Sequence, residues 1–503
     1  MTEKRTESGV PYCLAMDAWW LTEEENVTRK NPLLGLSVRK TFIQPSIGLV
    51  ALVTLGDFLF WGFRPGFSLA IFALAIFTIA NQRNFSLARC ARPMALMLLS
   101  ILPVLEYVQP LSVMILSLGT LMALAWSRLP SDAEAKWICA TFLGLSKSLP
   151  VSGIVAAYSV CVGLRRRKPV KASPRSLWRN WAFPLGGAFV LGSLLLLANP
   201  ILARVLSEIF DIELNVTKTM HRAMFGAGLA LMIWPMLNVQ RPCAALEFAG
   251  LRIGARMGLN SASVLRSLIV FNAFLVTQSV LDFSVLFAGA SLPEGMSYAT
   301  YVHRGAYPLL LTAVLAGAFA LGAWAFLKEN RWIQPLILLW VTQNALLSVS
   351  TLMRLKLYIA EYGLTYLRIY ALIWICLVAV GLVMIIWHIL AGRKLALLVR
   401  RIAILGAGTL YLCAFVNFAG LITTDAITRA AKNADQSAID WSYLCGLGNT
   451  VNGALARGTA QYPHLNLAAK SSACTKKSFT ALNWRENDLR RLRAQHAADV
   501  LFD

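Results

Sequence analysis

Long apolar segments recur along most of the chain, and no other feature constrains the fold as strongly. An α-helix needs roughly 20 mostly apolar residues to cross the hydrocarbon core of a bilayer. Only 14% of the 503 residues are charged, against about 25% in a typical soluble domain. The sequence therefore predicts an all-α, polytopic transmembrane helix bundle with about 11 spans, at 47–63, 66–81, 93–109, 110–127, 181–202, 222–238, 264–290, 307–327, 332–353, 367–391 and 402–424.

The segment 137–164 is apolar too, but Lys147 and Pro150 stand near its centre. Crossing the membrane here would put the basic run after it on the opposite side from the other basic loops. Lysine and arginine gather on the cytoplasmic side of membrane proteins. If 128–180 is instead a basic cytoplasmic or interfacial stretch, the inside regions hold 28 Lys and Arg and the outside loops about six. This asymmetry predicts an N-terminus inside and a C-terminus outside.

The net charge of +22 is explained by this topology, so we expect no nucleic-acid partner. Basic residues near a bilayer surface attract anionic lipids, each contributing about 1 kcal/mol. We expect membrane lipid with anionic head groups to contact Arg165, Arg166, Arg167, Lys168 and Lys171.

Composition divides the chain into three parts: a polar cytoplasmic N-terminal segment at 1–46, the transmembrane domain at 47–424, and a tail at 425–503. The tail is polar and is expected to be a small helical extracytoplasmic cap, with helices at Ile439–Leu447 and Trp484–Val500. Cys445 and Cys474 are the two cysteines on the predicted outer side. They form either a disulfide, as is common in oxidising compartments, or two independent buried thiols.

Polar residues inside the predicted spans are costly and mark either function or specific helix contacts. We expect Asp282 and Asp57 to pair with Arg354 or Arg368, and Gly363 to break the helix between these arginines. One interpretation is a polar pocket opening outward; the other is hydrogen bonding that holds helices together. The candidate cluster comprises Asp57, Asn272, Gln278, Asp282, Gln343, Asn344, Arg354 and Arg368.

The predicted outside loop 291–306 is dense in Tyr, His and Arg. Tyrosine suits a membrane interface, so an aromatic belt is one reading; acid–base or metal chemistry at Glu294 and His303 is the other. The connection between the predicted spans 332–353 and 367–391 is also expected on the outer side. Together with loop 291–306 it forms an outer-loop motif that comprises Glu294, Tyr298, Tyr301, His303, Arg304, Tyr358, Glu361 and Tyr362. The sequence has no Walker, HExxH or GxSxG signature and no CxxC. We therefore expect no catalytic residues, no cofactor and no metal site.

Several runs in the second half of the chain resemble the bacterial membrane family called domain of unknown function 4173, a relative of family 4153. They include Leu292-Pro293-Glu294-Gly295-Met296, His303-Arg304-Gly305-Ala306-Tyr307-Pro308, Gln343-Asn344, Arg354-Leu355, Tyr362-Gly363-Leu364-Thr365 and Trp484-Arg485. The resemblance covers roughly residues 45–490 and is most specific over 264–380. It implies a multi-pass protein of the bacterial inner membrane with no assigned biochemistry.

Three function classes remain open. The first is an envelope accessory or sensory component with an envelope protein partner, which fits the motifs on the predicted outer side. The second is a small-molecule or lipid transporter, supported by the intramembrane polar residues, although no pair of interrupted spans points to a transport site. The third is a membrane-embedded transferase acting on a lipid-linked substrate, an enzyme class for which the first outer loop, at Arg64-Pro65, is very short.

Overall fold

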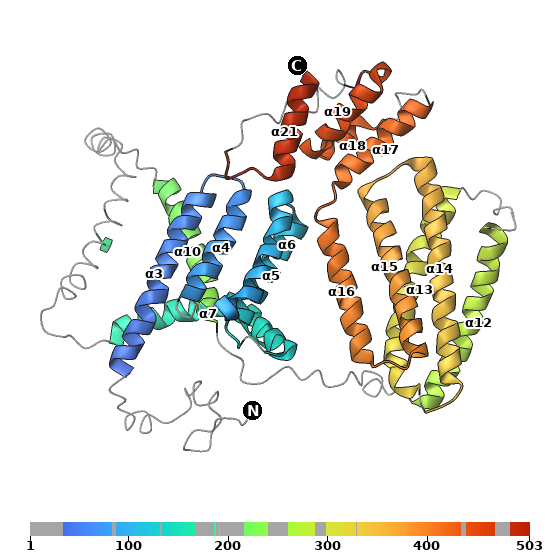
Figure 1. The fold of residues 1–503 in the computed structure, drawn as a ribbon, viewed down its shortest axis with the longest axis horizontal. Coiled ribbons are helices and arrows are strands. Elements are labelled where there is room, and N and C mark those ends of the chain that lie inside the picture. The colour runs from blue at the N-terminus through green and yellow to red at the C-terminus, as the bar shows by residue number, and fades with distance from the viewer. Residues whose placement is uncertain are drawn as a thin grey trace, which may run out of the picture. The chain divides into compact units, whose positions relative to one another are not determined.

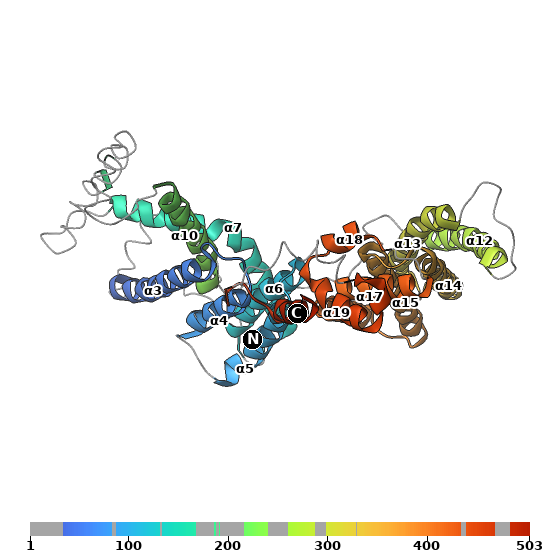
Figure 2. The ribbon, with the colours of Figure 1, turned by 90° about the horizontal axis from the view of Figure 1, so that it is seen from above.

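The computed structural model describes residues 34–82, 87–130, 133–166, 186–187, 191, 216–239, 260–286, 298–327, 329–433, 439–467 and 483–502. Within these ranges the regular structure is helical and there is no strand (Figures 1 and 2). The prediction of an all-α fold is thus confirmed for the described chain. The helices fall into two compact units.

The first unit comprises residues 1–104, 113–246 and 483–486. Its helices are α3 (Leu34–Phe60), α4 (Phe67–Asn81), α5 (Leu87–Glu106, up to Val104), α6 (Pro110–Ser127, from Val113), α7 (Ala135–Arg166) and α10 (Val216–Leu237). Gly62, with φ +78°, adopts a left-handed conformation in the turn that ends α3. The turn at 483–486 packs on this point, because Arg485 lies 3.8 Å from the Phe58 ring and Glu486 accepts a hydrogen bond from the Arg64 amide.

Glycines let the helices of this unit approach closely. A Cβ at Gly153 of α7 would lie 2.4 Å from the Leu231 carbonyl oxygen of α10, and one at Gly119 of α6 would lie 1.8 Å from the Ser100 hydroxyl of α5. Such approaches need a residue without a side chain. In Figure 1, α7 runs crosswise to α3 and α10 rather than alongside them.

The second unit comprises residues 105–112, 247–482 and 487–503. Its helices are α12 (Ser261–Leu286), α13 (Tyr298–Ala323), α14 (Ile333–Tyr362), α15 (Tyr366–Leu390), α16 (Leu395–Cys413), α17 (Phe418–Asn433), α18 (Trp441–Gly446), α19 (Asn452–Gln461) and α21 (Leu489–Phe502). Short 3-10 helices lie at Trp324–Phe326, Asn449–Val451 and Pro463–Leu465.

Helix α14 is the central helix of the second unit and packs against α12, α13 and α15. Ile333, Ile337 and Val341 of α14 are fully buried in a core with residues of α12, α13 and α15. A separate core joins the first turns of α15 to α17, α18 and α19. We call the described parts of 418–502 in this unit the C-terminal module.

Five helical segments are long and apolar enough to cross a membrane among the described residues: Pro110–Ser127, Ser261–Val280, Ile333–Tyr362, Tyr366–Leu390 and Leu395–Cys413. Three shorter apolar segments lie at Ser46–Phe60, Phe67–Asn81 and Leu311–Phe326. A membrane protein with several helical spans is therefore supported, whereas the count of eleven stays a prediction. Helix α7, which contains 137–164, is not among the five.

Three predicted boundaries are wrong. The predicted span 402–424 is two helices, α16 and α17, because Asn417 caps a new helix by accepting a hydrogen bond from the Gly420 amide at 3.0 Å. The span predicted at 332–353 continues to Tyr362, where Gly363 ends it as expected. Part of the predicted loop 291–306 is helical, since α13 begins at Tyr298. The predicted span 181–202 lies almost wholly outside the described residues.

The contact between Gly119 and Ser100 gives a stability prediction. A Gly119→Ala substitution should lower stability by about 1–3 kcal/mol, because the new methyl group overlaps Ser100 and forces α5 and α6 apart. Thermal unfolding in detergent measures this loss. Gly408→Ala in α16 is the matched control, because a Cβ there meets nothing within 4 Å; an equal effect of both substitutions would contradict the close packing.

Candidate functional site

One face of α14 carries a stripe of buried polar side chains inside a mostly apolar helix. Gln343, Asn344, Ser348, Thr351 and Arg354 are all buried. From Asn344 onward they are spaced by three or four residues, which places them on one side of the helix, and Gln343 precedes Asn344 directly. Ser348 and Thr351 donate hydrogen bonds to carbonyls one turn earlier, at 2.9 and 2.8 Å. The stripe therefore runs through the centre of the second unit.

Several polar atoms of the stripe and its neighbours have no hydrogen-bond partner among the described residues. They are Asn272 Oδ1, Trp340 Nε1, Gln343 Oε1 and Asn344 Oδ1. Asn272 uses its amide nitrogen to bridge helices, donating to the Leu336 carbonyl of α14 at 3.1 Å. A buried acceptor without a donor costs about 1–3 kcal/mol. The stripe therefore offers acceptors that are suited to water or a polar solute.

The C-terminal end of α14 is held by arginines. Arg368 of α15 donates to the carbonyls of Tyr362 and Gly363, and its guanidinium lies 4.4 Å from the Tyr358 ring. Such contacts satisfy carbonyls that a helix end leaves without an intrahelical donor. Glu361 and Tyr362 are exposed beside this turn.

Helix α17 of the C-terminal module also binds the end of α14, through Asp425 and Arg429, which we call the Asp425–Arg429 clamp. Arg429 donates to the carbonyls of Ile359 and Ala360, and it pairs with Asp425 at 2.9 Å. The same Asp425 carboxylate accepts the Leu364 amide at 2.9 Å. On the next helix, the Tyr443 hydroxyl accepts the Tyr366 amide at 3.1 Å. The turn between α14 and α15 is therefore bound to the C-terminal module at several points.

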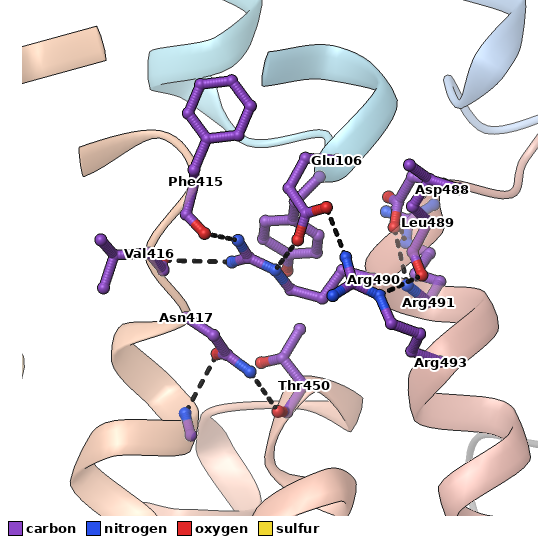
Figure 3. Close-up of polar contacts among 12 residues, drawn as sticks. Glu106, Phe415, Val416, Asn417, Thr450, Asp488, Leu489, Arg490, Arg491 and Arg493 are labelled. Carbon is purple, nitrogen blue, oxygen red and sulfur yellow. Dashed lines mark hydrogen bonds and ion pairs between the residues drawn. The ribbon is translucent and has the colours of Figure 1, made fainter. Parts of the chain in front are cut away.

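A second junction ties α21 to the rest of the second unit (Figure 3). Glu106 lies between two arginines of α21 and pairs with Arg490 at 3.4 Å and with Arg493. Arg490, whose side chain is only 7% exposed, also donates to the carbonyls of Phe415 and Val416 between α16 and α17. One arginine therefore joins α21, Glu106 and the α16–α17 connection.

Asp488 fixes the start of α21. Its carboxylate accepts hydrogen bonds from the amides of Arg491 at 2.8 Å and Val108 at 3.2 Å, so it caps the helix and binds the chain next to Glu106. The residue is fully buried. Burial raises the pKa of the Asp488 carboxyl above its ordinary value, against the opposing effect of the two amides and of Arg491 and Arg490.

The first unit holds one of the predicted residues in a different pair. Asp57 of α3 forms a two-pronged ion pair with Arg222 of α10. The expectation that Asp57 pairs with Arg354 or Arg368 is therefore wrong. The partner is an arginine 165 residues later in the chain, and no local sequence pattern would have identified it.

The other predicted residues divide into three groups. Asn272, Gln343, Asn344 and Arg354 lie on or beside the α14 stripe, and Arg368, Tyr358, Glu361 and Tyr362 lie at its end. Gln278 is half-buried on α12. The side chains of Asp282, Glu294, Tyr298, Tyr301, His303 and Arg304 lie outside the described residues, as do Arg165, Arg166, Arg167, Lys168 and Lys171.

The sequence did not point to Asp425, Arg429, Glu106, Asp488 or Arg490 as site residues. Asp488 did carry a usable signal, because aspartate is a preferred N-cap residue and Asp488 accepts the Arg491 amide three residues later. Cys445 is disulfide-bonded, whereas its predicted partner Cys474 lies outside the described residues. Within those residues no group of three or more His, Cys, Asp or Glu side chains is placed to hold a metal ion.

The contacts of Glu106 predict that a conservative substitution of this residue lowers the stability of the fold strongly. Glu106→Gln leaves the nearly buried Arg490 without its carboxylate, and removing one partner of a buried pair costs about 3–5 kcal/mol. Thermal unfolding and hydrogen exchange of α21 measure the loss. Glu134→Gln is the control, because its pair with Lys136 is exposed and such pairs contribute about 0–1 kcal/mol. Equal effects would show that Glu106 carries no special role.

The raised pKa of Asp488 predicts a pH dependence. A carboxyl that holds its proton more tightly when folded adds stability at low pH, and this gain disappears as pH rises through the folded pKa. Unfolding of the wild type should therefore become easier, relative to Asp488→Asn, as pH rises from about 3.9, the ordinary aspartate pKa. Parallel melting curves from pH 4 to 7 would argue against this shift.

A family model with the description "Domain of unknown function (DUF4153)" matches residues 47–458. No curated protein and no solved structure matches the chain. The resemblance of the sequence motifs pointed to family 4173, with 4153 as its relative, and the matched model is that of 4153. Since the match spans most of the 503 residues, the chain belongs to the family described as Domain of unknown function (DUF4153).

Proposed function

We propose that this protein is a sensory or accessory component of the bacterial inner membrane, in which α14 transmits the state of its buried polar stripe to the C-terminal module. The observation that carries the proposal is the Asp425–Arg429 clamp. Through Arg429, α17 binds the last carbonyls of the same helix that bears the stripe. A shift or rotation of α14 would therefore pull directly on the module.

Three features support a transmitting role over simple anchoring. The stripe and the clamp are at two places on one continuous helix of 30 residues. The stripe has acceptors without a donor, so occupancy by a polar group would change its energy. The module has its own core around Ile422, Ile427 and Leu455, so it can respond as a unit.

The test is whether a change in the stripe reaches the module through Arg429. Gln343→Leu should alter hydrogen exchange at amides 418–433 by roughly 2- to 30-fold, the range of known couplings between sites. The effect should vanish when Arg429→Gln is also present. Arg457→Gln, an exposed arginine on α19, is the control and should leave the coupling intact. An effect of Gln343→Leu that stops at Tyr362 in every background would refute the proposal.

A transporter is the second candidate, favoured by the unpartnered oxygens of Asn272, Gln343 and Asn344. Trp340 provides a reporter, because its buried indole NH has no partner among the described residues. A transported polar solute should change the wild-type tryptophan fluorescence, and Trp340→Phe should remove that change. Solute flux in vesicles that persists in Arg429→Gln would favour transport over sensing.

A further inference from the structure

An apolar groove lies in the first unit, between α7 and α10. Its cavity volume is about 510 Å³, within the roughly 300–1,000 Å³ typical of small-molecule sites. Leu149, Gly153 and Ile154 line it from α7, and Phe225, Gly228 and Met232 line it from α10. Among the lining residues that the structure describes, there is no charged or hydrogen-bonding side chain. A polar solute would lose its hydration here without gaining hydrogen bonds from the walls.

Two glycines shape the groove in opposite ways. Gly153 brings α7 against the α10 backbone, since a Cβ there would lie 2.4 Å from the Leu231 carbonyl oxygen. At Gly228 an added Cβ would meet nothing within 4 Å. The first glycine closes the helix crossing, and the second leaves open space beside it. The two glycines at the crossing of α7 and α10 therefore determine the shape of the groove.

Helix α7 carries a basic residue close in sequence to the residues that line the groove. Lys147 is exposed, lies two residues before Leu149, and shares a face of α7 with Ile154 seven residues later. It makes no ion pair within the described part of the chain, whereas Lys136 of the same helix pairs with Glu134 at 2.9 Å. Leu143 and Ile154, on the same face, are 41% and 59% exposed. This face of α7 thus combines exposed apolar side chains with one positive charge.

We infer that the groove binds one acyl chain of an anionic phospholipid, whose phosphate is held by Lys147. An acyl chain matches the wholly apolar lining, and a lysine with an apolar stem can place its ammonium at the head-group level. The stretch 128–180 is expected on the cytoplasmic side, where anionic lipids are concentrated. The residues of this site are different from Arg165–Lys171 and from those of the α14 stripe.

Native mass spectrometry of the full chain, with added phosphatidylglycerol or phosphatidylcholine, tests the two halves of the site separately. Gly228→Leu should fill the groove and lower retention of both lipids at least fivefold. Lys147→Gln should lower retention of phosphatidylglycerol about fivefold, the effect of one basic residue near a surface. Retention of phosphatidylcholine should fall less, because its choline group offsets the charge of its phosphate, so the preference for phosphatidylglycerol should shrink. Gly408→Leu and Lys136→Gln are the matched controls and should behave as wild type.

Wild-type retention of both lipids by Gly228→Leu would overturn the acyl-chain site. An unchanged preference for phosphatidylglycerol in Lys147→Gln would overturn the head-group contact. If Gly228→Leu fails to fold, Gly228→Ala takes its place, because the smaller side chain enters the same open space and should reduce retention in part. Wild-type retention by a folded Gly228→Ala would then count against the site.

Discussion

Backbone groups at the end of a membrane helix must find partners, and in this protein arginines supply them. A helix end leaves carbonyls without intrahelical donors: Arg429 of α17 binds the Ala360 carbonyl and Arg368 of α15 binds that of Tyr362. Arg429 also binds the Ile359 carbonyl, which accepts the Gly363 amide as well. Each arginine offers five donors in a fixed planar arrangement, so one side chain can satisfy two carbonyls at once. The position of the C-terminal module depends on this requirement.

The same chemistry recurs at the α16–α17 connection. There Arg490 binds the carbonyls of Phe415 and Val416, and Glu106 balances its charge. Asn417 uses both ends of its amide, capping α17 at Gly420 and donating to the Thr450 carbonyl at 2.9 Å (Figure 3). Breaks between helices in the second unit are thus stabilised by side chains from distant segments rather than by the local chain alone.

The apolar pattern was sufficient to predict several of the helices, because α4, α6, α12 and α15 coincide closely with predicted apolar segments. It failed at 402–424, where the hydropathy is continuous across a break that only the capping role of Asn417 reveals. Gln343, Asn344 and Arg354 of the α14 stripe were named as candidates because polar side chains are costly inside a predicted span. The partners Arg222, Arg429 and Arg490 were not, because they lie 165, 69 and 384 residues from the groups they bind and no local periodicity encodes such pairs.

The ion pair between Glu106 and Arg490 also bears on how the chain is made. Translation proceeds at about 5–20 residues per second, and earlier segments fold first. A separation of 384 residues means that Glu106 waits on the order of tens of seconds for its partner. Until then the Glu106 carboxylate and the carbonyls of Phe415 and Val416 lack the arginine that joins them. A chain truncated before Arg490 would keep these groups without their shared partner.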